Sequence, residues 1–459
     1  MNWDVTAVSR ALQSRQVSPK ELTEWVLERI EVENPKLNAF ITVMHEQAMA
    51  SAIEAEQDIM RGNIKSPLHG IPIGVKDLIY TKGIRTTMGS RVYKDFFPEY
   101  DASVVTKLKE AGAVIVGKLN THEFAYGTTG DSSYFGPVRN PYDVKKITGG
   151  SSSGSGAAVA AGLCYAALGT DTGGSIRIPA SFCGVVGMKP TFGRVSKWGV
   201  YPLCPTLDHV GPMTKTVRDN ALLLNVLVGY DSKDYFSIVR EREDFTDKLE
   251  KGVQGCVIGI PSSFFFEHLD SEIQAKMEHV ISVYQDLGAS IRFVDIENLD
   301  AVSKAHGTVL KSEAYAVHKH HLDDERSSWE GEVKNRLQTG KDVRAHEYLK
   351  AQEIKQQAIQ SFNQAFEQAD VLLTPVTSIL PPHLYERELE FNHKKIHVFS
   401  VLNKLTGISD LTGLPCMSVP CGLSDAGLPI GFQLTGRAFD ESNLYRYAYA
   451  YEQAVLHKQ

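Results

Sequence analysis

The chain of 459 residues has no long apolar run and no cluster of basic residues, and each absence argues against a class of function. No segment approaches the roughly 18 consecutive apolar residues of a membrane-spanning helix. The first residues lack the basic and apolar regions of a secretory signal, so we expect a cytoplasmic protein without a membrane partner. The net charge of −7 argues against direct nucleic-acid binding, because phosphate contacts need clustered lysine and arginine.

Cysteine is scarce, and the six cysteines show neither the close pairing of a zinc site nor the density of a disulfide scaffold. Cys183 lies eight positions after Ser175, and we interpret it as a buried structural residue. Three histidines lie on a predicted helix at 318, 320 and 321, but no His-Glu-x-x-His motif occurs. We therefore expect no metal and no other cofactor.

The chain does contain two serines in glycine-rich turns, Ser151 within 148–154 and Ser175 within 169–177. A run of small residues between them is predicted to form a helix. Flanking glycines can present each hydroxyl on bare backbone and leave N–H groups around the second serine to face an oxyanion. Upstream, Lys76 ends an apolar, β-prone run, and burial there would favour its neutral amine. A serine nucleophile with a lysine base, the chemistry of acyl transfer, is the leading interpretation.

Other uses of the glycine-rich stretch fit less well. A phosphate-binding P-loop closes with Gly-Lys-Ser or Gly-Lys-Thr, and residues 149–156 contain no lysine. A dinucleotide-binding fingerprint needs glycine or alanine at its third position, where this chain has Val159. A flexible linker is disfavoured because residues 157–168 are small and apolar and call for burial.

The segment 149–190 resembles the signature of the amidase signature family of serine hydrolases, and the resemblance extends to motifs at 117–120, 187–191, 413–415 and 429–433. It covers nearly the whole chain except about residues 230–400. It implies a catalytic triad of Lys76, Ser151 held by a cis peptide bond, and the nucleophile Ser175. The spacings of 75 and 24 positions between these residues agree with the family.

The resemblance also assigns supporting residues. We expect the oxyanion hole to use backbone N–H groups of Thr172, Gly173, Gly174 and Ser175. The remaining predicted residues either support the site or line the acyl group from a loop; they are Ser152, Asp171, Arg177, Gly127, Thr128 and Thr129. Pairing of Asp171 with Arg177 is a hypothesis, and both are expected to fix their loop and not to touch substrate.

The fold is predicted to be α/β. Short β-like runs at 114–116, 257–260, 291–294 and 371–373 follow helical patterns such as 271–287 and 344–369, which favours a sheet covered by helices. The resemblance implies one large α/β/α domain over 1–459 with a mixed, twisted central sheet. Within it we expect an N-terminal helical layer (1–65), a catalytic core (66–215) and a variable, substrate-shaping region (230–400).

The predicted function is hydrolysis of a linear carboxylic amide through a serine acyl-enzyme, giving an acid plus ammonia or an amine. Neutral Lys76 would accept the proton of Ser175 through Ser151. The expected partner is a small-molecule amide, and a homodimer is left open.

Two alternatives to a free-standing amidase stay open: the glutamine-hydrolysing A subunit of an aspartyl/glutamyl-tRNA amidotransferase, and a non-catalytic binding subunit. The intact set of Lys76, Ser151 and Ser175 argues against the latter. Asn403 stands ten positions before Gly413, where that A subunit has an acidic residue, which argues against recognition of the amino group of glutamine. Arg336 and Arg344 could meet a substrate carboxylate, but we interpret them as exposed helix arginines.

Overall fold

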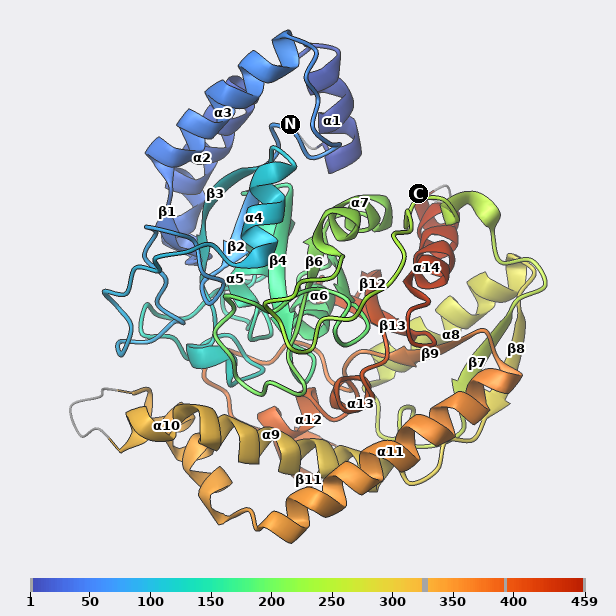
Figure 1. The fold of residues 1–459 in the computed structure, drawn as a ribbon. Helices are drawn as coiled ribbons and strands as arrows, with labels where there is room; N and C mark the ends of the chain where they lie inside the picture. The colour runs from blue at the N-terminus through green and yellow to red at the C-terminus, as the bar shows by residue number, and fades with distance from the viewer. Residues whose placement is uncertain (1–2, 324–328, 392–393, 457–459) are drawn as a thin grey trace.

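A mixed sheet of eleven strands crosses the molecule in the computed structural model, which describes residues 3–323, 329–391 and 394–456 (Figure 1). The strand order is β1-β3-β2-β4-β6-β5-β12-β13-β9-β7-β8. The strands of this sheet are β1 Phe40–Val43, β2 Pro72–Lys76, β3 Val114–Leu119, β4 Ala166–Asp171, β5 Val186–Lys189, β6 His209–Thr214, β7 Val257–Pro261, β8 Ser290–Val294, β9 Val371–Pro375, β12 Cys416–Leu423 and β13 Pro429–Thr435. A separate hairpin pairs β10 Glu388–Phe391 with β11 Lys394–His397.

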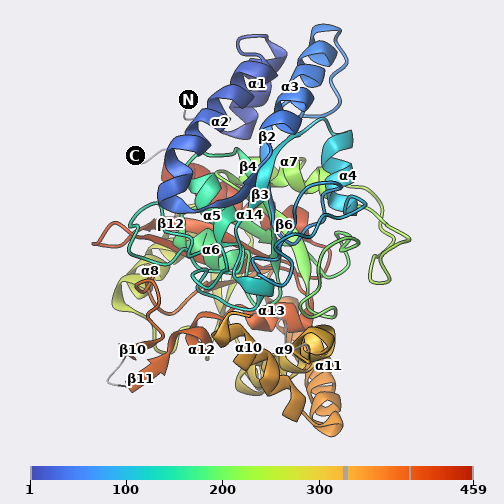
Figure 2. The same ribbon diagram turned by 90° about the vertical axis from the view of Figure 1, so that its left-hand side faces the viewer.

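Helices cover the sheet and both ends of the molecule. They are α1 Val5–Gln13, α2 Pro19–Leu37, α3 His45–Met60, α4 Ser103–Glu110, α5 Ser153–Ala160, α6 Arg177–Phe182, α7 Val217–Leu227, α8 Ser271–Asp286, α9 Leu299–Leu322, α10 Gly331–Gln338, α11 Ala345–Gln368, α12 Val398–Leu402, α13 Gly407–Thr412 and α14 Glu441–Leu456. Short 3₁₀ turns occupy Glu123–Ala125, Leu249–Lys251 and Thr339–Asp342. Figures 1 and 2 place α1–α3 and α9–α11 at opposite ends, with the sheet between them.

The sheet combines parallel and antiparallel pairs. Strand β2 runs parallel to β3 and β4, and β7 runs parallel to β8 and β9. The centre is antiparallel, from β4 through β6, β5, β12 and β13 to β9. Parallel neighbours need crossovers, and α4 lies between β2 and β3 as α8 lies between β7 and β8. This confirms the predicted α/β class with a mixed sheet.

The β-like runs and the two helical patterns that local sequence signals predicted are present. The four β-like runs lie in β3, β7, β8 and β9, and the two helical patterns coincide with α8 and α11. At the start of α2, Ser18 and Glu21 form a reciprocal capping box with Pro19 at the first helical position. The subdivision at 1–65, 66–215 and 230–400 stays a prediction.

The run between the two serine turns differs from the expected helix. Helix α5 ends at Ala160, and Gly162 has a φ of 68°, a left-handed conformation that glycine adopts at low cost. Strand β4 then begins at Ala166, so the small apolar residues are shared between a helix and a central strand. Both elements are buried, and small apolar side chains can be buried in a helix as well as in a central strand.

One buried cluster joins the two ends of the chain, since it contains Val5 of α1, Val75 of β2, Phe432 of β13 and Tyr451 of α14. All six cysteines are free and buried. Among the residues that the structure describes, no helix is both long enough and apolar enough to cross a bilayer.

Two glycine substitutions are expected to change stability in opposite directions. A Cβ on Gly117 of β3 would lie 2.5 Å from the backbone oxygen of Thr42 and 2.7 Å from Cδ1 of Phe40. Gly117→Ala should therefore lower the free energy of unfolding by about 1–3 kcal/mol. Gly307 of α9 has open space around its Cβ position, so Gly307→Ala should raise it by about 0.5–1 kcal/mol. Calorimetric melting of both variants checks this, and an unchanged melting temperature for Gly117→Ala would contradict the packing described here.

Candidate active site

Lys76, the last residue of β2, lies fully buried among hydroxyl groups. Its Nζ is 2.7 Å from Ser151 Oγ, 2.8 Å from Thr170 Oγ1 and 3.0 Å from Ser152 Oγ. Burial lowers the pKa of Lys76 to about 7, although the charges of Asp171 and Asp208 act to raise it. A neutral amine has two N–H groups and one lone pair, so one of three hydroxyl neighbours can donate to it. Lys76 is therefore placed to act as a base.

The turn that carries Ser151 lies directly before α5. The Gly150–Ser151 peptide bond is cis, and the Gly150 N–H donates to Thr128 O at 2.7 Å. The Ser152 N–H donates to Ser175 O at 3.1 Å, and the Ser152 hydroxyl donates to Thr170 O at 3.0 Å. These contacts bring the two serine turns together above the end of β2.

The turn that carries Ser175 follows β4 and precedes α6. Gly174 has a φ of 120°, and a Cβ there would lie 2.2 Å from Thr406 Oγ1, so the position requires glycine. The Asp171 carboxylate accepts from the N–H groups of Gly174 at 2.6 Å and Ile176 at 3.0 Å. The Gly174 N–H, expected in the oxyanion hole, thus points at Asp171. The roles of Thr172, Gly173 and Ser175 in that hole stay a prediction.

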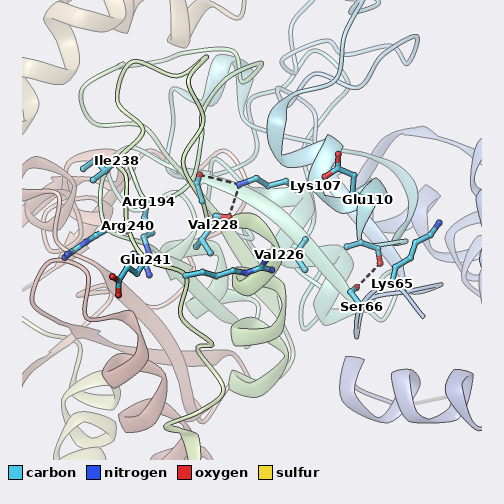
Figure 3. A pocket seen from close by; sticks show the side chains of 13 residues that line it. Lys65, Ser66, Lys107, Glu110, Arg194, Val226, Val228, Ile238, Arg240 and Glu241 are labelled. Carbon is cyan, nitrogen blue, oxygen red and sulfur yellow. Dashed lines mark hydrogen bonds between the residues drawn. The ribbon is translucent and has the colours of Figure 1, made fainter. Parts of the chain in front are cut away.

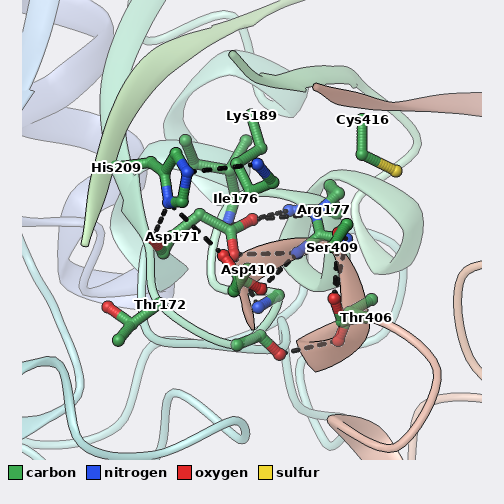
Figure 4. Close-up of polar contacts among 12 residues, drawn as sticks. Asp171, Thr172, Ile176, Arg177, Lys189, His209, Thr406, Ser409, Asp410 and Cys416 are labelled. Atoms are coloured by element: carbon green, nitrogen blue, oxygen red, sulfur yellow. Dashed lines mark hydrogen bonds and ion pairs between the residues drawn. The ribbon is translucent and has the colours of Figure 1, made fainter. Parts of the chain in front are cut away.

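A buried ion network supports this turn (Figure 4). Arg177 donates to Asp171 through Nε and Nη2, both at 3.0 Å, and Nη2 is also 2.7 Å from Asp410 Oδ2. Burial alone would raise the pKa of Asp171, but Arg177 outweighs it and holds that pKa well below its usual range. Nη1 donates to Thr406 O at 3.1 Å and Ser409 Oγ at 2.6 Å. The hypothesised Asp171–Arg177 pair is present, and it ties the turn to α13.

The loop at 127–131 packs against the Ser151 turn. A Cβ on Gly127 would overlap the ring of His122 at 2.1 Å, which explains the glycine. Thr129 Oγ1 donates to Asp131 at 2.6 Å, and Asp131 forms a bidentate pair with Arg387 at 2.9 Å for each bond. Thr128 Oγ1 is buried and has no hydrogen-bond partner within the described residues. Its hydroxyl is therefore a candidate contact for a ligand.

The interpretation of Arg336 as an exposed helix residue is wrong. Its side chain is only 12% exposed, and its guanidinium donates to Tyr126 O and to Glu332 and lies 3.9 Å from the Phe399 ring centroid. Tyr126 directly precedes the 127–131 loop, so Arg336 lies beside the predicted acyl site. Arg344 is exposed, as expected.

Sequence reasoning missed several residues that shape the site. Thr170 could have been found, because β2 and β4 are parallel and end at the same edge, which sets Thr170 beside Lys76. Asp410 and Arg387 carry no local signal, since each contacts the site from more than 230 positions away.

Thr170 and Thr172 line a cavity of about 340 Å³. Its walls are mainly apolar and aromatic; they include Leu78, Tyr100, Trp198, Tyr201, Leu203 and Phe236.

A second cavity of about 410 Å³ is lined by none of the candidate catalytic residues (Figure 3). It is rich in basic side chains, of which Lys107 donates to the backbone oxygens of Leu227 and Val228. Within the described part of the chain, no cluster of three or more His, Cys, Asp and Glu side chains is placed to hold a metal ion.

The comparisons with known proteins identify one family. The Amidase family model matches residues 21–445. The A subunit of glutamyl-tRNA(Gln) amidotransferase from Geobacter sp. strain M21 is 43% identical over 465 residues, which cover 96% of this chain and 95% of that protein.

Two solved structures are similar along nearly the whole chain. One, described as a vestigial protein complex that reveals the evolutionary origins of an s-triazine catabolic enzyme, has a TM-score of 0.95 and 32% identity and covers 98% of each chain. The A subunit of glutamyl-tRNA(Gln) amidotransferase from Thermotoga maritima has a TM-score of 0.81 and 34% identity, covering 95% of this chain and 91% of that one.

The fold and site therefore define an amide hydrolase, and the chain belongs to the Amidase family, the amidase signature enzymes. The predicted resemblance is confirmed.

The pH dependence of amide hydrolysis is expected to report Lys76. Because only the neutral amine accepts a proton and its pKa is lowered to about 7, kcat/KM should rise with pH, be half-maximal near pH 7 and level off at alkaline pH. Initial rates in buffers of constant ionic strength between about pH 5 and 9.5 measure this. Lys76→Met should lose the activity, and a flat wild-type profile would contradict a lysine base.

Proposed function

We propose that this chain is the glutamine-hydrolysing A subunit of an amidotransferase, releasing ammonia from a side-chain amide through a serine acyl-enzyme. The observation that carries the chemistry is the hydroxyl environment of Lys76, which contacts Ser151 at 2.7 Å. Support for the substrate comes from the 43% identity to the Geobacter A subunit along 96% of this chain. This differs from the free-standing amidase favoured by the sequence analysis.

In this mechanism Ser175 attacks the amide carbon while its proton passes through Ser151 to Lys76. The oxyanion accepts hydrogen bonds from the backbone around Thr172, Gly173 and Ser175. Collapse of the tetrahedral intermediate breaks the C–N bond, and Ser151 protonates the departing nitrogen. Water then loses a proton through the same relay, attacks the acyl-enzyme and releases the acid.

Two groups beside the 127–131 loop are candidates to bind the α-carboxylate of glutamine. The buried Thr128 hydroxyl has an unused hydrogen-bonding capacity among the described residues. Arg336 lies next to Tyr126 and already donates to Tyr126 O and Glu332, so a substrate carboxylate would have to share its guanidinium with Glu332.

A free-standing amidase is a second candidate, and two observations favour it. Half-buried Asn403 provides no negative charge for an α-ammonium group, and the nearby acids Asp131 and Glu332 are already paired with Arg387. The apolar cavity at Thr170 and Thr172 could receive an apolar amine, whereas ammonia needs no such space.

Ammonia or amine release by the purified chain distinguishes the two candidates. The substrates are glutamine, asparagine, malonamide, urea derivatives, and aliphatic and aryl amides, each tested with the chain alone and with the chain co-expressed with the other amidotransferase subunits of its genome. The proposal predicts that glutamine is hydrolysed, more than about tenfold faster with the partner subunits, and that Ser175→Ala abolishes turnover. Hydrolysis of another amide by the chain alone, with none of glutamine, would refute the glutaminase and establish the second candidate.

A further inference from the structure

Two side chains from outside the 66–215 segment contact the backbone of the predicted oxyanion hole. His306 Nε2, from α9, lies 2.9 Å from Thr172 O. Thr406 Oγ1, at the junction of α12 and α13, donates to Gly173 O at 2.6 Å. Two consecutive carbonyl groups of the turn before Ser175 thus each contact a side chain from outside that segment.

These contacts fix the direction of the neighbouring N–H groups. In a trans peptide unit, the C=O of one residue and the N–H of the next point in opposite directions. The bond to Thr172 O therefore orients the Gly173 N–H, and the bond to Gly173 O orients the Gly174 N–H. The second orientation is visible directly, because the Gly174 N–H donates to Asp171 Oδ1 at 2.6 Å. Because His306 contacts Thr172 O, the Gly173 N–H of the same peptide points away from His306.

The imidazole of His306 fits closely between two glycines. A Cβ on Gly173 would lie 3.0 Å from His306 Cε1, and one on Gly407 would lie 2.7 Å from His306 Nδ1. The side chain is buried, and burial lowers the pKa of His306, so the ring is neutral at pH 7. Because a carbonyl oxygen only accepts, the single ring proton must lie on Nε2.

We propose that His306 is a positioning residue for amide hydrolysis: it holds the Thr172–Gly173 peptide, while Thr406 holds the following Gly173–Gly174 peptide, so that the Gly173 N–H faces the oxyanion that forms on attack by Ser175. His306 does not touch the reacting atoms. The inference rests on the proposed acyl-enzyme chemistry but not on which amide is cleaved. It also connects the 230–400 region, expected only to shape the substrate site, to the rate of the chemical step.

The test compares His306→Leu, which fills space without a donor, with His306→Gln, whose Nε2 can replace the donated hydrogen bond. Loss of one oxyanion donor costs about 10²–10³ in kcat, and a misoriented donor should cost less. We expect His306→Leu to lower kcat about 10- to 100-fold with KM nearly unchanged, and His306→Gln to recover most of the loss. Phosphonylation of Ser175 by a fluorophosphonate, which also builds negative charge in the hole, should slow by a similar factor.

Controls separate this role from folding. Exposed His346 of α11 provides a matched control, and His346→Leu should leave both rates unchanged. If His306→Leu does not fold, as judged by circular dichroism and melting, Thr406→Val removes the donor to Gly173 O at nearly constant shape and should slow both reactions. The inference is overturned if the folded His306→Leu variant keeps wild-type rates, or if His306→Gln loses as much as His306→Leu. Failure of the proposed function would appear elsewhere, as a wild-type chain that hydrolyses no amide or a Ser175→Ala variant that does.

Discussion

The site depends on the burial of Lys76, which has no carboxylate partner in the part of the chain that the structure describes. Lys118 is equally buried, but its ammonium lies 3.7 Å from Asp77, and its pKa is lowered only to about 8. Among the described residues, the Nζ of Lys76 forms hydrogen bonds only with hydroxyl groups, so burial disfavours its charged form and lowers its pKa to about 7. Asp171, the carboxylate whose charge acts most strongly on Lys76, is paired with Arg177. The fold thereby keeps the amine available as a base.

In the turn that carries Ser175, the charged residues also serve to order the backbone. Asp171 and Arg177 form a buried pair that orders the backbone around Ser175, and Asp410 of α13 shares the arginine. Such a pair stabilises one backbone arrangement through several hydrogen bonds to main-chain N–H groups, which a point charge in solvent would not do. In the proposed mechanism Lys76, Ser151 and Ser175 perform the chemistry, and the Asp171–Arg177–Asp410 network orders the backbone that presents Ser175.

Sequence reasoning succeeded where the signal is local. Glycine-flanked serines and an apolar run ending in Lys76 each depend on residues close in the chain. The four predicted β-like runs and the helical patterns at 271–287 and 344–369 were found. It failed where contacts span the chain. Arg336 reaches Tyr126 across 210 positions and His306 reaches Thr172 across 134, so helical periodicity alone could not distinguish these side chains from surface residues.

The titration of Lys76 itself tests this account most directly. The protein labelled with 13C at the lysine Cε can be followed by NMR between about pH 5 and 11, with the Lys76 signal assigned by its absence in Lys76→Met. The account predicts one lysine whose Cε shift changes with a midpoint near pH 7, as burial lowers its pKa to about 7. A Lys76 signal that stays in its protonated position up to about pH 9.5 would contradict the account, because the base would then be an ammonium at the pH of catalysis.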